Sequence, residues 1–139
     1  MIAGTTSTTP TRAVGRLFLR TAVVAGLAGL SLGIFMGASH DHTFRTVHAH
    51  INLVGWVSLF LFGLFYALLG TASTRLAKIH YGLATGALIL FAVGLPSIAL
   101  GLPWGEPVAI LASFATLFSM ALFAYVVFTA GEAANPAAG

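Results

Sequence analysis

The chain contains four long stretches without a single Asp, Glu, Lys or Arg. A helix needs about 20 mostly apolar residues to cross the ~30 Å of hydrocarbon in a bilayer, and each stretch is long enough. Only 6% of all residues are charged and 58% are hydrophobic, whereas roughly 25% are charged in an average soluble domain. The sequence therefore predicts an integral membrane protein with four spans, one in each of Thr21–His40, Val47–Thr74, Ile79–Gly105 and Pro107–Gly131.

These spans predict an all-α, integral membrane four-helix bundle with a single transmembrane domain over about 17–130. The individual spans are expected at about 17–38, 47–69, 79–100 and 107–129. The polar, Thr-rich residues 1–16 are expected to form a disordered cytoplasmic tail, and the small residues 131–139 a second tail. An alternative, in which the first span is a cleaved secretory signal, fits the length of its apolar run less well.

The positive charges indicate how the chain is oriented in the membrane. Arg12, Arg16 and Arg20 precede the first span, and Arg75 and Lys78 separate the second span from the third. In a four-span chain both clusters lie on the same side, which the positive-inside rule assigns to the cytoplasm. We therefore expect a multi-pass protein of the bacterial inner membrane with both termini cytoplasmic. Its net charge of +3 reports this orientation and does not indicate nucleic-acid binding.

The segment SHDHTFRTVHAH holds four of the five histidines, at the start of the second span: His40, His42, His48 and His50. At about 100° per residue, His48 and His50 leave a helix on nearly opposite faces, so they do not readily share one ion. They can serve two separate sites, and a neutral imidazole is a good axial ligand for haem iron. Spacing alone is equally consistent with histidines that simply hydrogen-bond at the membrane interface.

The second span also resembles a known family. HAHINLVGWVSLFLFGLFY is similar to the tenth helix of the catalytic subunit of haem-copper oxidases and nitric oxide reductases. An H-x-H pair opens that helix, a small residue follows, and an aromatic residue lies beyond a phenylalanine; here these are His48, His50, Gly55, Phe62 and Tyr66. In that family the two histidines bind two haems on opposite helix faces. The resemblance thus implies haem b at His48 and His50, and it extends more weakly through RLAKIHYG and GLPWGEP.

The chain also departs from that family. The catalytic subunit has twelve spans in three arcs of four, so this chain resembles one four-helix arc. A homotrimer would supply twelve spans, with His50 of one protomer and His48 of the next on either side of one haem. The family's copper ligands have no counterpart here. His80 lies at the opposite end of the membrane from the H-x-H pair and is expected to be an interfacial or packing residue.

Three other side chains are expected near the cofactor. Arg45, one turn before His48, is a candidate guanidinium clamp for a haem carboxylate, with headgroup anchoring as the alternative. Asn52 is a candidate hydrogen-bond partner for a ligand or another helix. Trp56 lies near the proposed haem face.

The first span carries a stripe of small residues at Gly29, Gly33 and Gly37. Such a stripe allows another helix or a flat ligand to approach closely, and helix packing is the expected use.

These features predict a haem b protein that transfers electrons or binds a small gas, O2 or NO, in a respiratory setting. Any enzymatic activity would be that of an oxidoreductase, with catalytic residues unassigned. Two histidines on each iron favour electron transfer, and one leaves a position open for a gas. The alternatives are an accessory or assembly protein that carries copper through His40, His42 and His48, and a non-catalytic structural subunit.

Overall fold

The computed structural model describes residues 10–69 and 72–133, which are helical outside two short loops and the connection before residue 74. α2, η1 and α3 follow one another without a break, so the described residues form four helical rods and no strand. All four are long and apolar enough to cross a membrane. The expectation of an all-α fold with four helices of membrane-spanning length and composition is confirmed for the described residues. The elements are α1 (Pro10–Ser39), α2 (Arg45–His50), η1 (Ile51–Ser58), α3 (Leu59–Leu68), α4 (Thr74–Ala99) and α5 (Gly105–Ala133).

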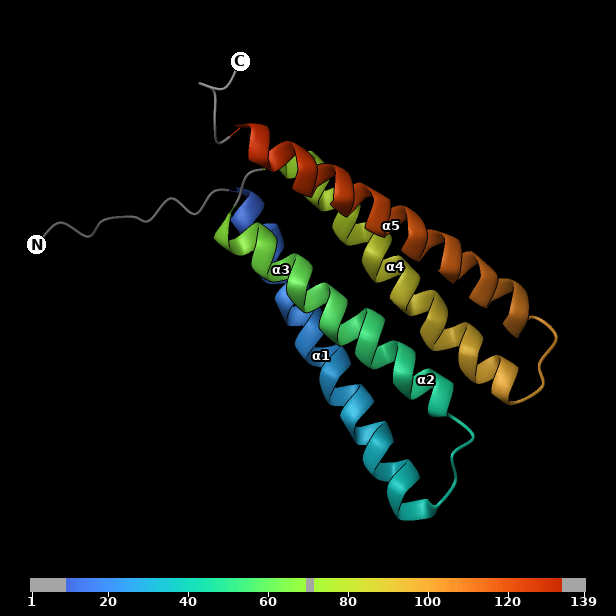
Figure 1. The fold of residues 1–139 in the computed structure, drawn as a ribbon. Helices are drawn as coiled ribbons and strands as arrows, with labels where there is room; N and C mark the ends of the chain where they lie inside the picture. The colour runs from blue at the N-terminus through green and yellow to red at the C-terminus, as the bar shows by residue number, and fades with distance from the viewer. Residues whose placement is uncertain (1–9, 70–71, 134–139) are drawn as a thin grey trace, which may run out of the picture.

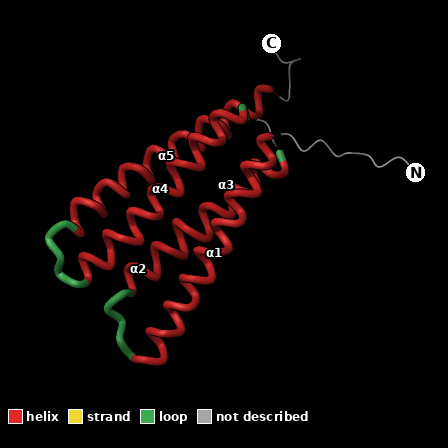
Figure 2. The backbone as a smooth tube through the Cα atoms, turned by 180° about the vertical axis from the view of Figure 1, so that it is seen from behind, coloured by secondary structure: helices red, strands yellow, loops and turns green. Residues whose placement is uncertain are grey.

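The four rods form two hairpins (Figure 1). α1 pairs with the second rod, which is made of α2, η1 and α3, and α4 pairs with α5. Both views show the rods close together at the end where α1 begins and α5 ends, and fanning out toward the loops at 40–44 and 100–104 (Figures 1 and 2). The H-x-H pair lies at the wide end and the aromatic core at the narrow end.

The narrow end is held together by a cluster of aromatic rings. Phe18, Tyr66 and His80 are fully buried there, and Phe62 and Phe123 pack against the His80 ring with centroid distances of 4.6 and 5.6 Å. Aromatic pairs favour such separations. The Tyr66 hydroxyl lies 2.9 Å from Nδ1 of His80, so His80 is a packing residue in the core and not an interfacial one.

The first helix begins earlier than the sequence predicts. Residues 10–16, assigned to a tail over 1–16, belong to α1, and residues 1–9 lie outside the described residues. The Thr11 hydroxyl donates to the carbonyl of Ala72 at 3.0 Å, and Gly15 lies directly against the backbone of α3. These tertiary contacts stabilise the first turns of α1, and no local sequence pattern indicates them. At the other end, α5 runs to Ala133, three residues into the predicted tail.

The second rod contains an eight-residue π-helical segment, η1, directly after His50. Two side chains bond to carbonyls along this part of the rod. The Asn52 amide donates to the His48 carbonyl at 2.8 Å, and the Ser58 hydroxyl donates to the Leu53 carbonyl at 2.8 Å. Because π-helical turns occur frequently at functional sites, the position of η1 beside the H-x-H pair makes His48 and His50 candidates for a functional site.

Candidate functional site

His48 faces α1. Its Nδ1 lies 2.8 Å from the carbonyl oxygen of Gly29, and a carbonyl only accepts hydrogen bonds, so Nδ1 carries the proton and donates it. In the neutral ring, Nε2 is then left with a free lone pair. Histidines that ligate metals commonly have this arrangement, since a backbone carbonyl on the other nitrogen fixes the tautomer and the ring orientation.

His50 faces α4. Its ring packs against Phe91 with a centroid distance of 4.8 Å, and its Nδ1 donates to the carbonyl of Thr46 at 2.9 Å. His50 therefore has the same tautomer as His48, with Nε2 free to bind an electrophile. The two imidazoles contact different neighbouring helices, in agreement with a separation of about 200° around the helix axis.

The glycines of α1 form notches that the second rod fills. A Cβ built at Gly29 would lie 2.5 Å from the Asn52 amide nitrogen, and one at Gly33 would lie 2.7 Å from Cε1 of His48. The predicted packing role of the stripe therefore applies at these two positions, while nothing lies within 4 Å of a Cβ at Gly37. Three side chains of the second rod enter successive notches: His48 at Gly33, Asn52 at Gly29 and Trp56 at Gly26.

Arg45 lies at the first turn of α2, exposed, on the rim of a groove of about 290 Å³ between α2 and α4. The groove adjoins His50, because Thr46, whose carbonyl holds the imidazole, is part of its wall. Its polar rim and apolar wall consist of Thr43, Arg45, Thr46, Val47, Leu95, Ile98 and Ala99. A guanidinium above an apolar wall suits an amphiphilic ligand with a carboxylate edge.

His40 and His42 lie exposed in the loop between α1 and α2. His40 has φ of 56°, which ends α1 in the left-handed region. Two hydrogen bonds from Thr43, at 2.6 and 2.9 Å, hold the pKa of Asp41 below its ordinary value. Across residues 10–69 and 72–133, no three His, Cys, Asp or Glu side chains gather where they could hold a metal ion. The structure thus does not bring His40, His42 and His48 together as a copper site.

Two polar features of the interior were not anticipated from the sequence. One is the pairing of Tyr66 with His80, whose residues lie on different helices. The other is a small cavity between the second rod, α4 and α5, which several hydroxyl groups line. Neither has a local sequence signal, because both depend on how the two hairpins dock.

No protein-family model, curated protein or solved structure matches this chain. The candidate site is therefore defined by its geometry alone: two imidazoles on opposite faces of one rod, each with Nδ1 bonded to a backbone carbonyl.

Proposed function

We propose that this chain is a haem b-binding protein of the bacterial inner membrane, related in design to the haem-copper oxidase catalytic subunit. His48 and His50 are the axial ligands, both termini are cytoplasmic, and the H-x-H pair lies near the outward face. When bound, haem b supplies a centre that exchanges one electron or, with one axial position open, binds a small gas.

The observation that supports this proposal most is the shared tautomer of the two imidazoles. Each Nδ1 proton is committed to a main-chain carbonyl, at Gly29 for His48 and at Thr46 for His50. The donor set therefore fits axial ligation, in which a neutral imidazole presents Nε2 to iron.

The surroundings of His50 also suit a flat amphiphilic cofactor. The groove next to it has an apolar wall and a rim with Arg45, which would bind a haem carboxylate by charge-assisted hydrogen bonds. On the other face of the rod, Trp56 borders a second, apolar groove of about 170 Å³ along α1.

We further propose a homotrimer. Its three protomers of four spans each would correspond to the three four-helix arcs of the haem-copper oxidase catalytic subunit. Cyclic symmetry gives every interface the same pair of surfaces. His50 of one protomer and the partner's His48 then ligate one haem, which gives one haem per protomer. If a protomer held its haems internally, removal of one histidine would leave the haem at the other unaffected.

The test is the visible spectrum of the protein purified in mild detergent, oxidised and reduced, with and without carbon monoxide. Reduced bands that carbon monoxide leaves unchanged indicate a six-coordinate haem and an electron carrier, and a shift indicates an open iron. His48→Ala and His50→Ala should each lower the haem-to-protein ratio, and His42→Ala, in the exposed loop, should not. A preparation that stays colourless after haem is added would refute the proposal.

A further inference from the structure

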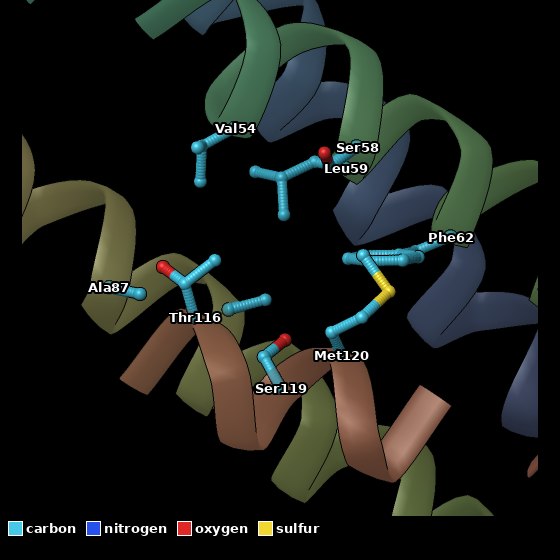
Figure 3. Close-up of a pocket in the computed structure, with 9 residues that line it drawn as sticks. Val54, Ser58, Leu59, Phe62, Ala87, Thr116, Ser119 and Met120 are labelled. Carbon is cyan, nitrogen blue, oxygen red and sulfur yellow. The ribbon is translucent and has the colours of Figure 1, made fainter. Parts of the chain in front are cut away.

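A small cavity lies about halfway along the helices, between the second rod, α4 and α5 (Figure 3). It offers about 20 Å³ to the centre of a water molecule, and roughly 10–15 Å³ is enough to hold one. Most of its wall is apolar, with Leu59, Ala84 and Ala87 among the lining residues, and three hydroxyl residues also line it: Ser58, Thr116 and Ser119.

Ser119 differs from the other hydroxyl residues of its helix. Ser113, Thr116 and Thr129 all donate to the carbonyl four residues earlier in α5, which is the usual way to satisfy a hydroxyl in a membrane helix. The Ser119 hydroxyl is buried without any partner. Figure 3 shows its oxygen pointing away from α5 toward the space between the helices.

An unpaired hydroxyl in this position is unfavourable. A buried polar group without a partner costs about 1–3 kcal/mol, and hydrocarbon around the bundle supplies no hydrogen-bond partner. The Ser119 side chain could avoid this cost by turning back to its own helix, as its neighbours do. Its orientation therefore indicates a partner within the cavity.

Another hydroxyl residue of the lining complements it. Thr116 lies three residues before Ser119 on α5 and lines the same cavity. Its proton is donated to the Ala112 carbonyl, so its oxygen has only lone pairs left to offer. A water molecule suits such a lining, because it can accept a hydrogen bond from Ser119 and donate its own protons.

We propose that this cavity binds a single structural water molecule, which accepts a hydrogen bond from Ser119. Its binding is independent of the proposed haem function and requires no cofactor.

The test is water-to-methyl magnetisation transfer in the full-length protein, labelled at alanine methyl groups and dissolved in deuterated detergent. Ala84 and Ala87 are 4% and 1% exposed and line the cavity, so they should receive magnetisation from water. Ala22, which is fully buried in the core away from the cavity, should not. The absence of transfer to Ala84 and Ala87 would overturn the proposal, as would shifts of their methyl signals under xenon, which enters dry apolar cavities.

Substitutions identify the residue that holds the water. Ser119→Ala should abolish the transfer to Ala84 and Ala87. Ser97→Ala is the matched control, because Ser97 is equally buried but donates to the Val93 carbonyl of its own helix; it should leave the transfer unchanged. Transfer that persists in Ser119→Ala would exclude Ser119 as the anchor. The wild-type measurement decides the presence of water even if a variant fails to fold.

Discussion

Gly33→Ala tests how the fold orients His48. The added methyl would lie 2.7 Å from Cε1 of the imidazole and 3.2 Å from Nδ1. To reach ordinary van der Waals contact at 3.4 Å, the ring has to retreat by about 0.7 Å. A retreat away from α1 lengthens the bond from Nδ1 to the Gly29 carbonyl from 2.8 Å to about 3.5 Å, beyond the ~3.2 Å limit for such bonds.

The magnitude follows from three contributions. Overpacking costs about 1–3 kcal/mol and the lost hydrogen bond about 0.5–1.5 kcal/mol, whereas replacing a glycine inside a helix contributes about 0.5–1 kcal/mol of stability. We therefore expect the free energy of unfolding of Gly33→Ala to fall by about 0.5–4 kcal/mol. Its haem content should also fall, because the ring loses both its orientation and its fixed tautomer.

The matched control is Gly37→Ala, one turn further along the same helix, where nothing lies within 4 Å of the new methyl. It should be as stable as the wild type, or more stable by about 0.5–1 kcal/mol, with unchanged haem content. Unfolding by SDS in mixed micelles and the reduced visible spectrum give the two readouts. If Gly33→Ala matches Gly37→Ala in both, the notch at Gly33 does not position His48 and the reasoning is refuted.

Three further outcomes are expected. Gly15→Ala should destabilise the protein by about 1–3 kcal/mol, because its Cβ would meet the backbone of α3 at 2.5 Å; wild-type stability in SDS unfolding would contradict this close contact. Tyr66→Phe leaves a buried imidazole nitrogen unpaired and should lower stability by about 1–3 kcal/mol, whereas Tyr125→Phe, at a 60% exposed residue, should have no effect in the same assay. The chain has no cysteine, so a membrane-impermeant maleimide should label His42→Cys in intact cells and Lys78→Cys only after lysis; the reverse pattern would invert the proposed orientation.

The spans could be predicted because their cause is local. A span needs only an uncharged run long enough to cross the hydrocarbon, and such a run can be read directly from the sequence. The second span, for example, is expected at about 47–69 and is found at Arg45–Leu68. The opposite directions of His48 and His50 follow from helix geometry in the same way.

The rest of the site could not be predicted because its causes lie between helices. Nothing within the second span indicates that the Gly29 carbonyl is the partner of His48, or that Tyr66 pairs with His80. The π-helical segment η1 has no periodic signature either. The early start of α1 depends on a contact of Thr11 with Ala72, far along the chain.

The π-helical segment also imposes an angular relation between the two halves of the second rod. Each residue of an α-helix turns the chain by about 100°, and a π turn closes its hydrogen bond over one more residue than an α turn does. The eight residues of η1 therefore turn the chain less than eight α-helical residues would. If they rewound into an α-helix, both imidazoles would rotate relative to the aromatic core, away from Gly29 and Phe91. The π-helical winding of η1 is thus as much a determinant of the site as the histidines themselves.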